Sequence, residues 1–317
     1  MKPAVSVVIP LYNKEGTLAR AIDSVLSQTI SDFELIIAEG PSNDGSSAVV
    51  SSYNDPRILR FTQEGHGVSA ARNQAIAKAS AEFIAFLDAD DQWMPDFLET
   101  VLHLYSVFPD AGMYGTAYTV FSEGKQVRNI QRDPDLGDRV FPSYFEEYIS
   151  AGHPIIITSA FAAPKHVLEH VGGYPEYLRV GEDHELFGKI ALAYPVAYSP
   201  KICSRYNLGS ENNADVVDYL LEVPLKTYLE HVPSNGVCPL NTAGLDEYLA
   251  HWKIRTGGRN IYSGFRKEGR MQVLSANTSK YRMIKTAFLL LSYVPLNLSR
   301  IPSSTVRKIL RMVNLSI

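Results

Sequence analysis

Short apolar runs and helical patterns alternate along the first part of the chain. Each run of strand character is followed by a segment with apolar residues at helical spacing, and this happens four times in about 110 residues. Such alternation predicts a mostly parallel central sheet covered by helices on both faces. The expected strands are 5–9, 34–38, 58–61 and 83–87, and the expected helices are 17–28, 46–53, 68–79 and 95–105.

After residue 110 the pattern is less regular, and the chain divides into three parts: 1–110, 111–214 and 215–317. The third part reads as mainly helical. In the second part we expect further sheet at 113–121, a long surface loop at 123–139, a helix at 141–149, a strand at 154–159, helices at 164–171 and 181–193, and a short strand at 196–198.

Three carboxylates crowd the C-terminal end of the strand at 83–87. Asp88 and Asp90 are two residues apart, so their side chains project to the same face. Like charges this close repel, and a bound cation relieves the repulsion. Aspartate oxygens without a nearby Cys or paired His favour Mg²⁺ or Mn²⁺ over zinc. The alternative is a solvated acidic loop in which Asp91 caps the helix that follows.

Polar loops follow three of the four expected strands. They span residues 10–13, 39–44 and 88–91. In parallel sheets ligands bind beyond the carboxyl ends of the strands, so we expect these loops to meet at one pocket.

Five sequence blocks, in order, resemble the signature of the family 2 glycosyltransferases with a GT-A-type fold. The resemblance covers roughly residues 4–200 and implies a Rossmann-like, mostly parallel central sheet flanked by helices, here with a mainly helical C-terminal extension. The blocks are 6–13, 39–46, 67–73, 87–91 and 181–183.

The resemblance implies inverting transfer of a sugar from a nucleotide-diphosphate donor, with a UDP- or dTDP-sugar expected, to an acceptor hydroxyl in bacterial surface polysaccharide or lipopolysaccharide synthesis. It makes Asp90 the ligand of Mn²⁺ or Mg²⁺ and sets Asp88 against the ribose or a metal-bound water. It makes Asp183 the general base, with Glu182 orienting it or touching the acceptor. The alternative for Glu182 and Asp183 is that they only stabilise the helix, because acidic residues are favoured in the first turn of any helix.

The resemblance also implies further donor contacts. Pro10 and Tyr12 follow the first strand, and the Tyr12 ring can stack on the base. Glu39 stands where the family usually has aspartate, as an acceptor for the base's ring N–H. Arg72 suits the base or the diphosphate. The alternatives are a rim position for Tyr12, a surface carboxylate for Glu39 and a salt bridge to the clustered acids for Arg72. Residues 1–110 are then the donor-binding half and 111–214 the acceptor-binding half.

Charge is divided unevenly between the body and the tail. The first 250 residues carry a formal charge of −16, whereas the remainder carries +12. Bases around the apolar stretch 287–298 fit an amphipathic helix at an anionic membrane surface. The alternative is a helix packed on the core with a solvated basic face. No aromatic-interleaved basic motif accompanies the charge, which argues against nucleic acid.

We expect a cytoplasmic protein, peripheral on the inner face of the cytoplasmic membrane, that acts on a glycan or lipid-linked glycan. The chain starts directly with a short strand rather than a leader, and two cysteines are too few for a disulfide scaffold. One rival is a nucleotidyltransferase that makes sugar nucleotides, but it needs a glycine-rich phosphate loop after the first strand, and residues 10–16 hold one glycine. The other is a non-catalytic nucleotide-sugar-binding protein.

Overall fold

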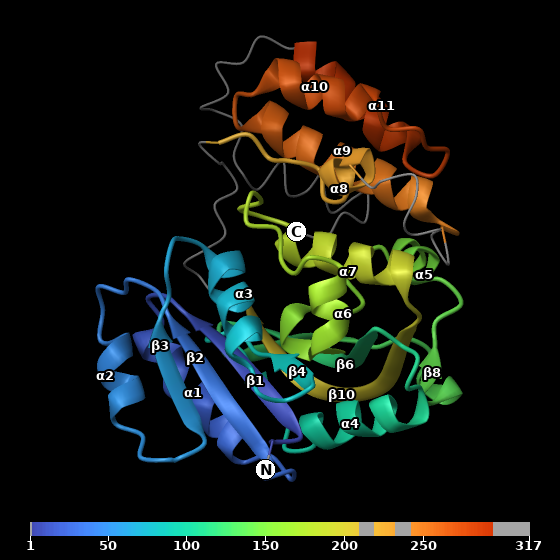
Figure 1. Cartoon of the computed structure of the whole chain (residues 1–317). Coiled ribbons are helices and arrows are strands. Elements are labelled where there is room, and N and C mark those ends of the chain that lie inside the picture. Colours follow the sequence, from blue (N-terminus) through green and yellow to red (C-terminus); the bar gives the residue numbers. More distant parts are fainter. Residues whose placement is uncertain (1, 209–218, 232–241, 294–317) are drawn as a thin grey trace.

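The computed structural model describes residues 2–208, 219–231 and 242–293, and Figure 1 shows a central sheet with helices on both faces and a helical layer beyond it. The sheet has ten strands, with the order β3-β2-β1-β4-β9-β6-β10-β5, while β7 pairs with β6 and β8 with β10. The strands are β1 Val5–Leu11, β2 Phe33–Glu39, β3 Ile58–Thr62, β4 Phe83–Phe86, β5 Gln92–Trp93, β6 Met113–Ser122, β7 Lys125–Ile130, β8 Arg139–Val140, β9 Phe161–Pro164 and β10 Val196–Leu208.

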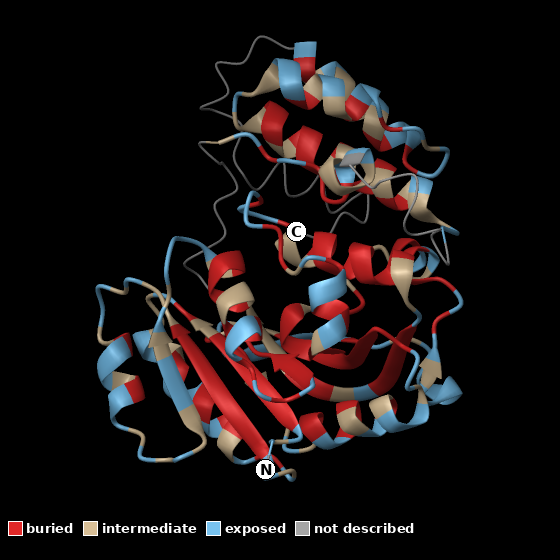
Figure 2. Ribbon diagram, viewed as in Figure 1, coloured by how far each residue is buried: buried red, intermediate tan, exposed pale blue. Residues whose placement is uncertain are grey.

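The first 110 residues fold as the hydrophobic pattern predicts. Strands β1 to β4 are mutually parallel along β3-β2-β1-β4. Alternate residues of β1 supply two cores: Val7 and Ile9 pack on one face of the sheet and Val8 on the other. The central strands are accordingly buried along their length (Figure 2). The helices of this part are α1 Glu15–Leu26, α2 Ser46–Ser51, α3 Val68–Lys78 and α4 Phe97–Val107.

The predicted surface loop at 123–139 is wrong in its first half, because residues 123–130 form an edge hairpin with β6. Strand β7 pairs antiparallel with β6 across a turn at Glu123 and Gly124, both of which have positive φ. All of β7 except Ile130 is exposed. An edge strand needs no apolar face, so the hydrophobic pattern does not reveal it.

The predicted strand at 154–159 is also wrong. Ile155 and Ile156 are fully buried, but they precede a short 3₁₀ helix, η2 Thr158–Ala160, and the strand β9 begins only at Phe161. Here an apolar run reflects burial and not strand pairing. The strand predicted at 196–198 continues to Leu208 as β10, which pairs with β6 through an irregular register near Lys201.

The remaining helices lie in the second and third parts of the chain. They are η1 Pro134–Leu136, α5 Tyr144–Ala151, α6 Lys165–His170, α7 Glu182–Ala193, α8 Lys226–His231, α9 Leu245–Tyr262, α10 Arg266–Leu274 and α11 Arg282–Tyr293.

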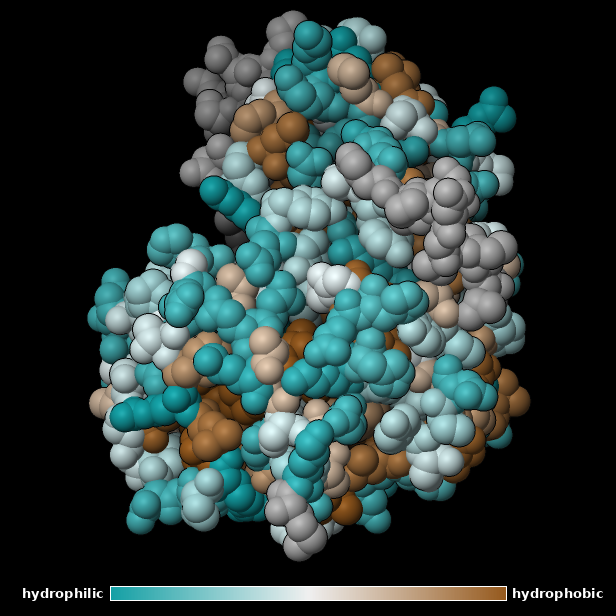
Figure 3. Space-filling view, in the orientation of Figure 1, coloured by the Kyte–Doolittle hydropathy of each residue, from teal (hydrophilic) through white to brown (hydrophobic). Residues whose placement is uncertain are grey.

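The described part of the C-terminal extension is helical, as predicted. Helices α10 and α11 pack on α9 and on each other. A Cβ on Gly257 of α9 would lie 2.7 Å from the carbonyl oxygen of Gly269, so the two glycines allow α9 and α10 to approach closely. Brown residues lie among teal ones over this layer at the top of Figure 3. Residues 294–298 of the predicted amphipathic stretch lie outside the described residues.

Candidate active site

A cavity of about 510 Å³ opens at the carboxyl ends of β1, β2 and β4. The loops after all three strands contribute to its wall, as does the start of α3. The structure thus brings together the three loops that the sequence places at one sheet edge. The lining residues are Pro10, Leu11, Tyr12, Lys14, Gly40, Pro41, Gln63, His66, Gly67, Val68, Ala71, Arg72, Asp88, Ala89 and Asp90.

Arg72 joins the cavity to the start of α7. Its side chain is almost fully buried; Nη2 donates to Asp88 at 2.7 Å and Nη1 donates to Glu182 at 3.0 Å. The guanidinium also lies 4.9 Å from the centre of the Tyr174 ring. Burial lowers the pKa of Arg72, but the charges of Asp88 and Glu182 outweigh it, so the net pKa is raised and the group stays charged. The structure therefore shows the salt bridges to the clustered acids, and because Arg72 also lines the cavity, its contact with a donor stays a prediction.

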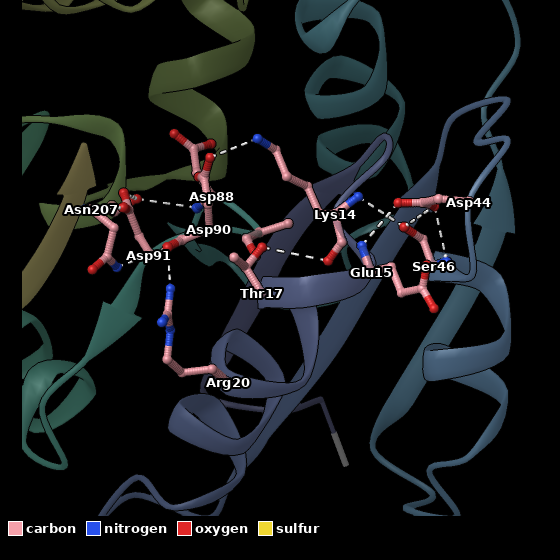
Figure 4. Close-up of polar contacts among 12 residues, drawn as sticks. Lys14, Glu15, Thr17, Arg20, Asp44, Ser46, Asp88, Asp90, Asp91 and Asn207 are labelled. Carbon is pink, nitrogen blue, oxygen red and sulfur yellow. Dashed lines mark hydrogen bonds and ion pairs between the residues drawn. The ribbon is translucent and has the colours of Figure 1, made fainter. Parts of the chain in front are cut away.

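Asp90 sits on a fixed backbone and pairs with Lys14. Thr17 Oγ1 donates to the carbonyl of Ala89 at 2.9 Å, and Arg20 Nη2 donates to the carbonyl of Asp90 at 3.0 Å, so α1 holds this turn in place (Figure 4). Lys14 Nζ lies 2.8 Å from Asp90 Oδ2. Both side chains line the cavity and are partly exposed to it.

Asp91 is a buried structural carboxylate, and its prediction as a helix cap is wrong. Its two oxygens accept hydrogen bonds from Ser159 Oγ at 2.5 Å and from the backbone N–H of Asn207 at 2.8 Å. Helix α4 begins after Asp96, well beyond it. Burial, with Asp88 and Asp90 adding to the effect, raises the pKa of Asp91 well above its ordinary value. Asp91 therefore ties the acidic turn to η2 and β10.

Glu182 and Asp183 open α7, directly after Gly181, whose φ of 86° suits glycine. Asp183 Oδ1 accepts the backbone N–H of His184 at 2.8 Å. The His184 ring is also near, with Nε2 at 3.9 Å, but burial lowers the pKa of His184 to about 3, so the ring is neutral. Burial raises the pKa of Asp183, and Asp88 adds to the rise. Burial and the Asp183 charge likewise raise the pKa of Glu182.

The other predicted donor residues differ in how directly they face the cavity. Pro10 and Tyr12 line it, and the Tyr12 side chain is exposed, as a stacking platform must be. Glu39 ends β2, and its carboxylate lies 3.9 Å from Arg60 Nε. Its neighbours Gly40 and Pro41 form the cavity wall in its place. Contact between Glu39 and a nucleobase stays a prediction.

Sequence reasoning missed Lys14 as a site residue. Its position offered a signal, because Lys14 directly follows the polar loop after the first strand and is a basic residue in a site predicted to be rich in carboxylates. Ser159 and Asn207, the partners of Asp91, gave no such signal, since they come from η2 and β10 and reach the site only through the fold.

The donor set fits Mg²⁺ or Mn²⁺ held jointly with a diphosphate. In residues 2–208, 219–231 and 242–293, no group of three or more His, Cys, Asp or Glu is arranged to hold a metal by itself. Mg²⁺ commonly takes one or two carboxylates and completes its shell with substrate phosphates and water. Asp90 offers such a carboxylate at the cavity wall, beside Asp88.

The sequence of residues 6–172 matches the model of the glycosyl transferase family 2. The chain belongs to this family. This confirms the family predicted from the five blocks. One family 2 relative is WfgD of Escherichia coli, named as a UDP-Glc:alpha-D-GlcNAc-diphosphoundecaprenol beta-1,3-glucosyltransferase, which is 39% identical over 112 residues, or 35% of this chain and 44% of that protein. The chain spans less than half the length of the curated relatives it matches.

Solved structures confirm the predicted GT-A-type fold. The structure of Staphylococcus aureus TarS residues 1–349 in complex with UDP-GlcNAc has a TM-score of 0.65 and 18% identity, over 92% of this chain and 89% of that one. A mannosyltransferase of Pyrobaculum calidifontis, in complex with GDP-Man and Mn²⁺, has a TM-score of 0.52 and 15% identity, over 100% of this chain and 81% of that one.

Proposed function

We propose that this family 2 chain is an inverting glycosyltransferase of bacterial surface polysaccharide or lipopolysaccharide synthesis. It takes a sugar from a UDP- or dTDP-sugar and transfers it to a hydroxyl of a glycan or lipid-linked glycan. The observation that carries the proposal is the Arg72 bridge, which joins the acidic turn of the donor cavity to the helix that begins with Glu182 and Asp183. The printed activity of WfgD and the UDP-GlcNAc bound to TarS support the donor and the lipid-linked acceptor.

On the donor side, the chain binds and orients the nucleoside diphosphate. Asp90 would hold Mn²⁺ or Mg²⁺, which when bound neutralises negative charge on the departing diphosphate. Arg72 fixes the carboxylate of Asp88 for the ribose or a metal-bound water. Tyr12 stacks on the base, Pro10 shapes the cavity wall, and we assign Glu39 to the ring N–H of the base.

On the acceptor side, Asp183 takes the proton. As the acceptor oxygen attacks the anomeric carbon, its O–H proton passes to Asp183 and the bond to the diphosphate breaks, with its electron pair leaving on the phosphate oxygen. Attack from the face opposite the leaving group inverts the configuration. The raised pKa of Asp183 suits a base that must accept a proton near neutrality. Glu182, held by Arg72, keeps the first turn of α7 in place.

This mechanism divides the chain as the sequence suggests: residues 1–110 bind the donor, 111–214 supply the base and the acceptor site, and 215–317 form the basic extension. The nucleotidyltransferase alternative lacks support because the loop after β1 carries only one glycine. A non-catalytic sugar-nucleotide-binding protein would not depend on Asp183.

The deciding experiment is a thermal-shift screen of nucleoside diphosphates with and without Mn²⁺, followed by donor hydrolysis and transfer assays. We expect UDP or dTDP to raise the melting temperature only together with Mn²⁺. Stabilisation without turnover of any matching sugar nucleotide would favour the binding protein, and no stabilisation by any nucleotide would reject the function.

We further propose that the extension binds the inner face of the cytoplasmic membrane. The segment from Arg266 to Tyr293 carries six bases and one acid. Large apolar side chains are exposed beside these bases. They are Met271, Leu274, Met283, Leu290 and Tyr293. Among the residues described, no helix has the length and hydropathy to cross a bilayer. The pattern is that of a surface-lying amphipathic layer.

A vesicle test separates this membrane proposal from a merely solvated basic face. The full chain should co-sediment with anionic vesicles in low salt and leave them as salt rises. Changing the two apolar residues Met283 and Leu290 to Ser should weaken binding while the basic charge is unchanged. A chain that stays in the supernatant with anionic vesicles in low salt would reject membrane binding.

A further inference from the structure

Gln63, the residue directly after β3, lines the cavity with a side chain that the proposed mechanism does not use. Its backbone N–H donates to the carbonyl of Glu39 at 2.8 Å, so the ends of β2 and β3 are tied together at this point. The carboxylate of Glu39 itself lies 3.9 Å from Arg60 Nε, and Glu39 does not line the cavity. Gln63 therefore brings a side-chain amide to the part of the wall where the proposed function places the base.

The orientation of this amide is fixed by the loop that follows it. Gln63 Nε2 donates to the carbonyl oxygen of Gly65 at 3.3 Å and to that of Gly67 at 3.4 Å, and both glycines have positive φ. A carbonyl accepts hydrogen bonds and cannot donate them, so the NH₂ end of the amide faces the loop and Oε1 faces away from it. The loop is held in turn by Gln74 of α3, which forms hydrogen bonds of 2.9 and 2.5 Å with the backbone N–H and carbonyl of Glu64.

The oxygen of the Gln63 amide lies against Gly40 in the cavity wall. A Cβ on Gly40 would be 3.3 Å from Gln63 Oε1 and 3.5 Å from Cβ of Tyr12. The absence of a side chain at Gly40 thus leaves Oε1 close to Tyr12, the residue proposed to stack on the base. Among the contacts of the described residues, nothing donates to Oε1, and the Gln63 side chain is only partly buried. The cavity therefore contains an oriented hydrogen-bond acceptor without a donor.

We propose that Gln63 Oε1 is a second acceptor for the ring N–H of the donor's base, beside the carboxylate of Glu39, and that Gln63 determines which bases the cavity accepts. One N–H can be shared between two acceptors. Uracil and thymine carry a ring N–H at N3, whereas the N3 of cytosine is itself an acceptor, and two acceptors that face each other disfavour binding. The inference rests on the proposed function and deepens it, because it assigns the preference for UDP or dTDP over CDP to a residue.

The test is calorimetric titration of the full chain with UDP and with CDP, each in the presence of Mn²⁺. Wild type should bind UDP roughly tenfold or more tightly than CDP. Gln63→Leu removes the acceptor and should weaken UDP binding roughly three- to tenfold, the range for one lost hydrogen bond. CDP loses no hydrogen bond to Oε1, so its affinity should stay the same or rise. The preference for UDP over CDP should therefore shrink by at least the factor lost for UDP.

A matched variant separates the acceptor from the loop that carries it. Gln74→Leu removes the hydrogen bonds that hold Glu64 and loosens the same loop, but it leaves the Gln63 amide in place. Gln74→Leu should therefore keep the wild-type preference for UDP over CDP, even if it weakens the binding of both nucleotides. An equal loss of preference in Gln63→Leu and Gln74→Leu would assign the effect to the loop and overturn the role of the Gln63 acceptor.

The outcomes also separate this inference from the function on which it rests. If wild type binds UDP with Mn²⁺ and Gln63→Leu keeps the same preference over CDP, only the role of Gln63 is refuted. If wild type binds neither nucleotide, the donor site is refuted together with it. If wild type prefers CDP, both the acceptor and the proposed UDP or dTDP donor are wrong.

Discussion

The acidic turn after β4 and the first turn of α7 both carry carboxylates, but the surroundings of these carboxylates differ. Asp88 and Asp90 each have a cation within 2.8 Å, from Arg72 and Lys14 respectively. No such ion pair is described for Asp183, whose oxygen lies 3.9 Å from the neutral ring of His184, although the charge of Arg72 acts on it to lower its pKa. Two carboxylates are therefore paired with a cation, and the third, which is partly buried, accepts a backbone N–H.

The contacts of each carboxylate, and not its residue type, therefore distinguish these two parts of the molecule. A partly exposed carboxylate at a cavity wall is suited to bind a metal ion, and through that ion a diphosphate. A partly buried carboxylate with a raised pKa is suited to take up a proton. Arg72 links the two kinds of site, since one guanidinium contacts Asp88 and Glu182 together.

The largest expected effect comes from removing the proposed proton acceptor, Asp183. Asp183→Asn should lower kcat by roughly 10²- to 10⁴-fold, the range for a lost general base. UDP with Mn²⁺ should bind within about twofold of wild type. Steady-state kinetics and calorimetry measure the two quantities.

Stability provides the control for this variant. The folded pKa of Asp183 is raised, so its ionisation costs stability as the pH rises above the unfolded value of about 3.9. Asparagine removes that cost, and Asp183→Asn should be at least as stable as wild type at neutral pH. A marked loss of stability, or full activity, would contradict the assignment of the base.

A somewhat smaller effect on transfer is expected from removing the proposed metal ligand, Asp90. Asp90→Ala should remove the Mn²⁺ dependence of UDP binding and lower transfer by about 10²-fold or more, because the charge on the leaving diphosphate loses several kcal/mol of stabilisation. Thermal shift with and without Mn²⁺ measures the dependence. Transfer that still responds to Mn²⁺ in Asp90→Ala would remove the metal role from this residue.

The two cations of the cavity should differ in their contribution to the free energy of unfolding. Arg72→Met leaves Asp88 and Glu182 without their buried partner and should cost about 3 kcal/mol at neutral pH. Lys14→Gln breaks a partly exposed pair and should cost at most about 1 kcal/mol. Urea denaturation measures both. Equal costs would mean that the Lys14 pair is as tightly built as the Arg72 bridge.

The smallest effect is a displaced pH profile. The raised pKa of Asp183 means that kcat/KM should fall with falling pH already above the ordinary aspartate range of about 3.9, because the base must be ionised in the free enzyme. The profile measured in wild type should lose this limb in Asp183→Asn. A wild-type rate that stays constant down to about pH 4 would contradict a shifted base.

The hydrophobic pattern of the sequence was enough to predict the fold wherever side-chain periodicity and burial agree. The strands of the first 110 residues are apolar because both faces of a parallel sheet are covered, so their position is visible in the chain. Periodicity misses β7, whose edge position needs no apolar face, and misreads Ile155 and Ile156, which are buried without pairing.

The site was predictable to a similar degree. The carboxylates Asp88, Asp90 and Asp183 and the base Arg72 lie in motifs at strand ends or helix starts, where position alone indicates chemistry. Which carboxylate meets which cation was not predictable, since Arg72 and Glu182 are 110 residues apart and Lys14 and Asp90 are 76 apart.

The amino-acid sequence by itself determined the alternation of strands and helices, the family, and the residues that carry charge to the sheet edge, because these follow from short-range pattern and residue type. Only the tertiary structure decided that Lys14 pairs with Asp90, that Arg72 bridges two carboxylates, and that Asp91 accepts hydrogen bonds from Ser159 and from β10. Charge pairing depends on distances of a few ångströms between segments far apart in the chain, and only packing sets those distances.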